Sequence, residues 1–130
     1  MMNEVFFSGP AITEFHPETD DQDWFFSVHE AFTVRWCGIT VLIPKGQETD
    51  LASIPMILQN IMPLVDNHLQ IAIVHDMCYR HEVGVVKQDA DMMFYDGMRT
   101  LGVGWWKAQA MYNAVRFFGD SSFKGTGSVL

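Results

Sequence analysis

The sequence predicts an α+β fold, in which a small antiparallel sheet formed by the N-terminal third packs against three to four helices. Up to residue 45 apolar and polar residues alternate with a period of two, which is typical of strands with one buried face. From residue 50 onward apolar residues recur at helical spacing. Because all the strands precede the helices, separate sheet and helix layers are expected.

The first 45 residues contain four stretches rich in β-branched and aromatic residues. The expected strands are Ile12–Phe15, Trp24–Val28, Phe32–Trp36 and Ile39–Ile43. Between the last two, Cys37-Gly38 predicts a two-residue hairpin turn, with glycine supplying a positive φ angle.

Helices are expected in the rest of the chain, each ended by proline or glycine. A short one begins near Ser53 and ends at Pro63; the others run from Asp66 or Asn67 to about Glu82, over Lys87–Leu101 and over Trp105–Phe118. We expect residues 1–118 to form a single domain and the Gly- and Ser-rich residues 119–130 to form a flexible tail.

Composition and charge limit the class of function. The chain has 130 residues, 48% of them hydrophobic, which is enough for a core, and its net charge is -8. Residues 1–34 contain seven acids and no Lys or Arg. Nucleic-acid binding depends on Lys and Arg, so no nucleic-acid partner is expected. No apolar stretch is long enough to cross a bilayer, and two cysteines fit a reducing cytoplasm.

Titratable side chains fall on the helices expected to be buried. His75 and Tyr79 share one stripe of the second long helix, and Asp91 lies on the apolar face of the third. Asp89 and Asp96 point nearly opposite, toward the expected solvent side. A short loop makes the two helices a hairpin, so Asp91 is expected to reach His75.

Such a pair has two interpretations, and both stay open at this point. A carboxylate on one imidazole nitrogen fixes the tautomer and makes the other nitrogen a better base. His75, Tyr79 and Asp91 are therefore candidate catalytic residues. Alternatively, the pair is a buried polar contact that only fixes the register of the helices.

For the remaining charged and aromatic helix residues, the sequence predicts pairing or burial from spacing alone. Asp76 and Arg80 are spaced to pair at i, i+4. On the fourth helix, Trp105 is expected in the core, with an exposed aromatic patch of Trp105 and Trp106 as the alternative. Arg116 borders the core face of this helix and is available to a buried carbonyl group or acid.

Several motifs resemble a family of small phage and prophage proteins, a domain of unknown function. These motifs are Lys45-Gly46, Thr49-Asp50-Leu51-Ala52-Ser53-Ile54-Pro55, His75-Asp76 with Tyr79, Ala90-Asp91 with Phe94, and Met111 to Gly119. The resemblance covers residues 44–119. It implies a phage or prophage origin, synthesis in a host cytoplasm, association with the virion, and a phage or host protein as partner.

His75-Asp76-Met77-Cys78-Tyr79 with Asp91 is also similar to the core of phospholipase A2 enzymes. That resemblance implies that His75 is the base, that Tyr79 and Asp91 support it, and that Asp76 binds a divalent cation, Ca²⁺ or Mg²⁺. The glycine-rich calcium loop of those enzymes has no clear counterpart, so the loop Lys45–Asp50 would have to supply further ligands through Asp50 or its own carbonyl groups.

Two hypotheses of different class follow. In the first, the protein is a metal-assisted hydrolase that cleaves an ester or related bond of the cell envelope. In the second, it is a non-catalytic virion, tail, assembly or host-interaction component in which the His75 and Asp91 cluster is structural.

Overall fold

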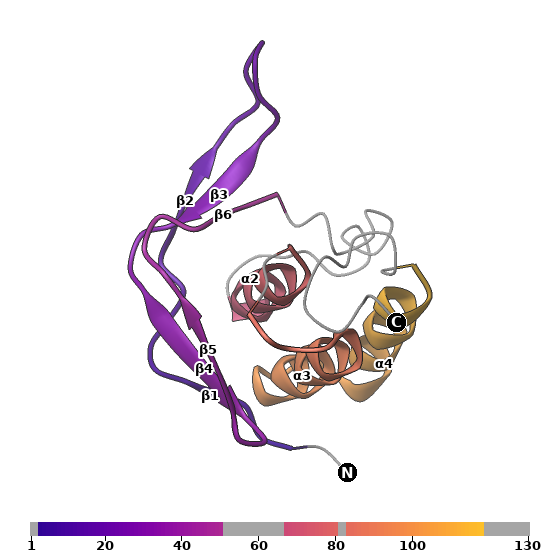
Figure 1. Cartoon of the computed structure of the whole chain (residues 1–130). Coiled ribbons are helices and arrows are strands. Elements are labelled where there is room, and N and C mark those ends of the chain that lie inside the picture. Colours follow the sequence, from indigo (N-terminus) through magenta and orange to yellow (C-terminus); the bar gives the residue numbers. More distant parts are fainter. Residues whose placement is uncertain (1–2, 51–66, 81–82, 119–130) are drawn as a thin grey trace.

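The computed structural model describes residues 3–50, 67–80 and 83–118, and it confirms the α+β class (Figure 1). The strands are β1 (Phe6–Phe7), β2 (Thr13–His16), β3 (Phe25–Val28), β4 (Phe32–Trp36), β5 (Ile39–Ile43) and β6 (Glu48–Thr49). The helices are α2 (Asn67–Arg80), α3 (Lys87–Thr100) and α4 (Trp105–Phe118). The short helix expected near Ser53 and the tail expected at 119–130 lie outside the described residues.

The strands form two three-stranded antiparallel sheets rather than the single sheet that was expected. One sheet has the order β1-β4-β5 and the other β2-β3-β6. The short strands β1 and β6 were not predicted, because two residues are too few to show alternation. Both sheets line the same side of the helices, with α2 nearest to them, and the β2–β3 hairpin extends beyond the helical layer (Figure 1).

The turn between β4 and β5 has the predicted geometry. Cys37 and Gly38 have φ angles of 48° and 80°, and Trp36 pairs directly with Ile39. Two successive positive φ angles are typical of a type I′ hairpin, whose twist matches that of the flanking strands.

The core lies between the sheets and α2. Phe32, Val34 and Trp36 alternate toward the helices, while Thr33 and Arg35 between them are less buried. Helix α2 is buried around most of its circumference, as its continuous apolar sequence predicts. Helix α3 packs on α2, and α4 packs on α3.

Two side-chain predictions were wrong. Asp96 is only 5% exposed instead of facing solvent, because the Trp36 side chain of β4 reaches it and Trp36 Nε1 donates a hydrogen bond of 2.7 Å to Asp96 Oδ2. Trp105 is 65% exposed and Trp106 57% exposed, so the aromatic patch is correct and the core position of Trp105 is not. Ala108, Met111 and Val115 form the buried face of α4.

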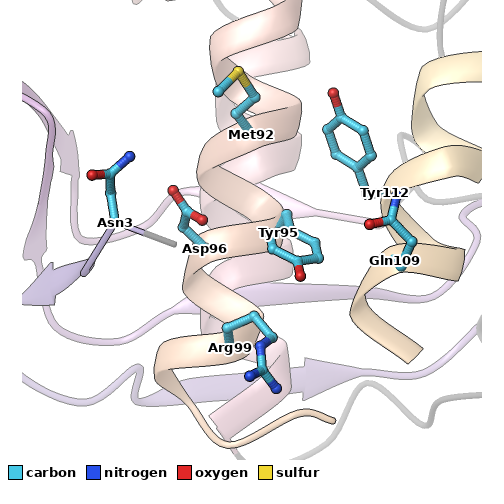
Figure 2. Close-up of a pocket in the computed structure, with 7 residues that line it drawn as sticks. All are labelled: Asn3, Met92, Tyr95, Asp96, Arg99, Gln109 and Tyr112. Carbon is cyan, nitrogen blue, oxygen red and sulfur yellow. The ribbon is translucent and has the colours of Figure 1, made fainter. Parts of the chain in front are cut away.

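A cavity of about 480 Å³ lies between the N-terminal segment, α3 and α4 (Figure 2). Its lining residues are Asn3, Met92, Tyr95, Asp96, Arg99, Gln109 and Tyr112. Among the described helices, none has the length and apolar character needed to span a membrane.

Candidate functional site

The candidate site is built where α2 and α3 cross. Gly97 allows a close approach, since a Cβ atom placed there would lie 2.4 Å from Cδ1 of Ile71. Gly84, with a φ angle of 81°, lies in the turn between the helices. Residue 71 meets 97 and residue 75 meets 91, so the two helices run antiparallel, as expected for a hairpin. This arrangement sets Asp91 opposite His75.

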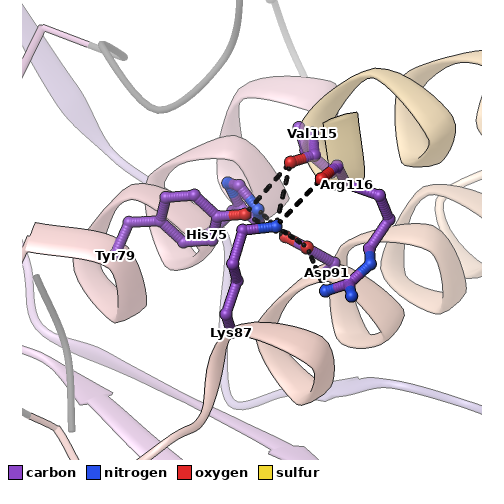
Figure 3. Close-up of polar contacts among 6 residues, drawn as sticks. All are labelled: His75, Tyr79, Lys87, Asp91, Val115 and Arg116. Atoms are coloured by element: carbon purple, nitrogen blue, oxygen red, sulfur yellow. Dashed lines mark hydrogen bonds and ion pairs between the residues drawn. The ribbon is translucent and has the colours of Figure 1, made fainter. Parts of the chain in front are cut away.

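Asp91 contacts both predicted partners (Figure 3). His75 Nε2 lies 2.8 Å from Asp91 Oδ1, and the Tyr79 hydroxyl donates to the same oxygen at 2.5 Å. All three side chains are buried. The expected contact between Asp91 and His75 is therefore confirmed, whereas the roles of these residues in catalysis stay predictions.

Two cations complete this group, which we call the Asp91 cluster: His75, Tyr79, Lys87, Asp91 and Arg116. Lys87 Nζ and Arg116 Nη1 each lie 3.0 Å from Asp91 Oδ2. Lys87 was missed in the sequence, although its i, i+4 spacing from Asp91 is the signal that could have found it. Arg116 had been predicted only to be available to an unnamed buried carbonyl group or acid.

Lys87 also links α3 to α4. Its Nζ donates to the carbonyl oxygens of Val115 at 3.2 Å and Arg116 at 3.4 Å, near the C-terminal end of α4 (Figure 3). Carbonyl groups in the last turn of a helix lack intrahelical partners, and the helix dipole makes this end attractive to a cation. The Asp91 cluster therefore joins all three described helices.

The surroundings of Asp91 favour its ionised form. Burial alone would raise the pKa of this carboxyl group, but hydrogen bonds from His75, Tyr79 and Lys87 and the charge of His75 outweigh burial and lower the pKa below its usual value. An ionised Asp91 accepts hydrogen bonds only, so His75 presents Nε2–H to it. Any base chemistry at His75 would consequently use Nδ1.

The other predicted site residues lie beside β6. The Thr49 hydroxyl donates to Asp76 Oδ2 at 2.5 Å, and both residues are buried. Asp50 forms an ion pair of 2.6 Å with Arg80, in place of the expected pairing of Arg80 with Asp76. Both members of that pair are partly exposed, so it adds little to stability.

The contacts of Asp76 and Asp50 limit the ligands that remain for the expected divalent cation. Calcium takes six to eight oxygen ligands. Within 3–50, 67–80 and 83–118, no group of three or more His, Cys, Asp and Glu side chains is placed to hold a metal ion. Asp76 and Asp50 also have Thr49 and Arg80 as partners, and a guanidinium repels a cation. The described residues therefore do not by themselves fit a calcium site, and a cation at Asp76 and Asp50 stays a prediction.

Comparison with known proteins identifies a family. "Uncharacterized protein y4jT" of Sinorhizobium fredii (strain NBRC 101917 / NGR234) is 36% identical over 84 residues, which are 63% of this chain and 25% of that protein. The match thus spans about a quarter of the relative's length. No solved structure matches the chain significantly.

A family model described as "Protein of unknown function (DUF1353)" matches residues 26–115. This range extends from β3 into the last turn of α4 and includes every member of the Asp91 cluster except Arg116. Because the match covers more than half of the 130 residues, the chain belongs to this family, the proteins of unknown function DUF1353.

Proposed function

We propose that this protein hydrolyses an ester or a related bond and that His75 is the base that activates water. The observation that carries the proposal is the contact of His75 Nε2 with the buried Asp91, which also accepts the Tyr79 hydroxyl. A base needs a fixed tautomer and orientation, and an ionised carboxylate supplies both. The ring of His75 also packs against Tyr79 and Phe94, at centroid distances of 4.1 and 4.6 Å.

The reaction would proceed by general base catalysis. His75 Nδ1 takes a proton from water while the water oxygen attacks the carbonyl carbon and the carbonyl π electrons move to its oxygen. When the tetrahedral intermediate collapses, the bond to the leaving oxygen breaks and the imidazolium returns its proton to that oxygen. Asp91 stays ionised throughout and stabilises the imidazolium by charge. An ester and water thus yield an acid and an alcohol.

The phage or prophage origin belongs to the same proposal. It rests on the resemblance of the Thr49–Pro55 string and the His75, Asp91 and Met111–Gly119 motifs to phage proteins. A hydrolase of this origin would act on envelope bonds of its host.

An ester-hydrolysis screen tests the enzyme proposal. We expect His75→Gln to abolish turnover and His68→Gln, on the same helix but outside the cluster, to retain it. Assays with added Ca²⁺, Mg²⁺ or Zn²⁺, together with calorimetric titration of wild type, Asp76→Asn and Asp50→Asn, test the cation. If no ester is cleaved above the His75→Gln background under any of these conditions, the hydrolase proposal is wrong.

A second candidate is a non-catalytic virion or assembly component, and one observation favours it. The side chains of His75 and Asp91 have no exposed surface, which suits a structural pair better than a site open to substrate. In this case, the acidic N-terminal third, or the aromatic end of α4 with Trp105 and Trp106, would provide the contact with a phage or host protein. Wild-type behaviour of a folded His75→Gln variant in phage assembly, with no esterase activity in either protein, would contradict a catalytic role and support this alternative.

A further inference from the structure

The cavity between the N-terminal segment, α3 and α4 is lined by a buried carboxyl group, Asp96, that has no countercharge among the described residues. Asp96 is 95% buried, and its Oδ2 accepts the Trp36 indole N–H. Among residues 3–50, 67–80 and 83–118, none is a cation within ion-pair distance of this carboxylate. Burying an ion without a countercharge is costly, so Asp96 differs sharply from Asp91, which has two cations.

The second oxygen of Asp96 faces the cavity. In the described part of the chain, no buried side-chain nitrogen or oxygen lacks a hydrogen-bond partner. The described residues supply no donor to Asp96 Oδ1, so this atom is the accessible one, at the wall that Asp96 lines. An oxygen in this position is ready to accept hydrogen bonds from a cationic ligand.

Arg99 contributes the opposite charge to the same cavity. It follows Asp96 by one helical turn, yet the two side chains do not pair, and Arg99 Nη1 instead donates to the carbonyl oxygen of Val103 at 3.1 Å. A guanidinium has five N–H donors, so most remain for an anionic ligand group. The cavity thus offers a hydrogen-bond acceptor, on Asp96, to a cationic group and hydrogen-bond donors, on Arg99, to an anionic group.

Aromatic side chains form the wall toward α4. Tyr95 and Tyr112 pack edge to face, with centroids 6.1 Å apart and planes at 76°. Figure 2 shows Asp96 and Asn3 on one side, Gln109 and Tyr112 on the other, and Tyr95 between them. Aromatic faces attract ammonium groups and pack well against apolar groups.

We propose that this cavity binds a small zwitterion whose ammonium group meets Asp96, whose carboxylate or phosphate meets Arg99, and whose apolar part packs on Tyr95 and Tyr112. Its volume of about 480 Å³ lies within the range of about 300–1,000 Å³ that is typical of small-molecule sites. A free amino acid with an aromatic or aliphatic side chain has this chemistry, and an ethanolamine phosphate headgroup has the same two charges with its two methylene groups as the apolar part. No member of the Asp91 cluster lines the cavity, so the inference does not depend on the hydrolase proposal.

Calorimetry and NMR titration of the whole chain test the proposal. The probes are phenylalanine, O-phosphoethanolamine, phenethylamine, which lacks the anionic group, and 3-phenylpropionate, which lacks the ammonium group. We expect saturable binding of phenylalanine or phosphoethanolamine, and the one that binds identifies the source of the ligand. Binding of phenethylamine and 3-phenylpropionate should be weaker by roughly tenfold or more, as expected for loss of a charged hydrogen bond. The Trp36 indole N–H resonance should shift during the titration, because this group bonds to Asp96.

Three variants complete the experiment. Asp96→Asn keeps an acceptor for Trp36 but removes the charge, and Arg99→Gln tests the anionic half even if Asp96→Asn does not fold. Both should weaken zwitterion binding by roughly tenfold or more, whereas Asp89→Asn, on the same helix but outside the cavity, should not change it. Absence of saturable binding, equal affinity for phenethylamine, or wild-type binding by either folded cavity variant would overturn the proposal.

Discussion

Asp91 is the side chain whose surroundings most clearly require its charge. Four side chains donate to its two oxygens, and the carboxylate itself has no exposed surface. Such an arrangement offsets the cost of burying the ion only while every partner is present. Removing the carboxylate would remove the acceptor and the countercharge that it supplies to His75, Lys87 and Arg116.

We therefore expect Asp91→Ala to lower the free energy of unfolding by about 3–5 kcal/mol, as is usual when one member of a buried ion pair is removed. Asp89→Ala, an equivalent truncation in the first turn of the same helix, should change it by no more than about 1 kcal/mol, which is the usual effect of losing an acid at a helix N-terminus. Urea denaturation followed by circular dichroism measures both. Equal midpoints for the two variants would mean that the cluster contributes nothing to stability.

The lowered pKa of Asp91 also predicts a pH dependence. A carboxyl group whose folded-state pKa lies below its unfolded value stabilises the fold above the unfolded pKa of about 3.9. This stabilisation is lost as the pH falls through the folded-state pKa. The stability difference between wild type and Asp91→Asn should therefore be largest near neutral pH and shrink below about pH 5. Urea midpoints compared at about pH 7 and about pH 3 test this, and an unchanged difference would contradict it.

At the scale of the elements, one hydrogen bond joins the β1-β4-β5 sheet to α3. Trp36 on β4 donates to Asp96 on α3, and both residues are buried. We expect Asp96→Ala to cost about 1–3 kcal/mol, because it leaves the indole N–H without an acceptor. Trp36→Phe, Asp96→Ala and the double variant form a cycle whose coupling energy isolates this contact. Additive effects of the two substitutions would show that the sheet and α3 are not coupled here.

The crossing of α2 and α3 depends on Gly97. Alanine normally stabilises a helix interior by about 1 kcal/mol relative to glycine. Here its methyl group would lie 2.4 Å from both Cδ1 and Cγ1 of Ile71, and overpacking typically costs about 1–3 kcal/mol. Net destabilisation is therefore expected for Gly97→Ala and should be relieved by Ile71→Ala in the same chain. Gly9→Ala, where the added atom meets nothing, is the control for thermal unfolding. Stabilisation by Gly97→Ala alone would contradict the close crossing.

The sequence predicted the helices and strands more accurately than the contacts between them. Periodicity and flanking glycines determine a helix locally, so the ranges expected for α3 and α4 agree with the structure to within one residue. Asp91 was placed correctly because its own helix has a clear apolar face. Asp96 was not, since its partner Trp36 is 60 residues away on β4, and helical periodicity carries no information on that contact. Arg116 could be assigned to Asp91 only once α4 was placed against α3, whereas the i, i+4 spacing of Lys87 from Asp91 was already present in the sequence.

At the scale of the whole molecule, the acidic hairpin and the buried Asp91 cluster lie in different parts of the structure. Five of the seven acids of residues 1–34 lie on β2 or between β2 and β3, namely Glu14, Glu18, Asp20, Asp21 and Asp23. This hairpin extends beyond the helices (Figure 1), whereas the Asp91 cluster joins the helices. Phe15 on this hairpin is exposed and lies 5.2 Å from Phe26, centroid to centroid. A substitution in the hairpin can therefore alter partner contacts without disturbing His75, and the two proposed functions can be tested separately.

The two cysteines provide a probe of the whole fold. Cys37 is exposed in the β4–β5 turn, whereas Cys78 on α2 is buried, and burial raises its pKa to about 12. The thiolate is the reactive form, so a disulfide reagent near neutral pH should modify Cys37 rapidly in the native protein and Cys78 only when α2 becomes accessible. The rate at Cys78, measured in a Cys37→Ser variant, should then rise with urea in parallel with unfolding, and it should be faster in Asp91→Ala at every urea concentration below the midpoint. Rapid modification of Cys78 in native wild type would show that α2 is accessible without unfolding, which would contradict the buried core around His75.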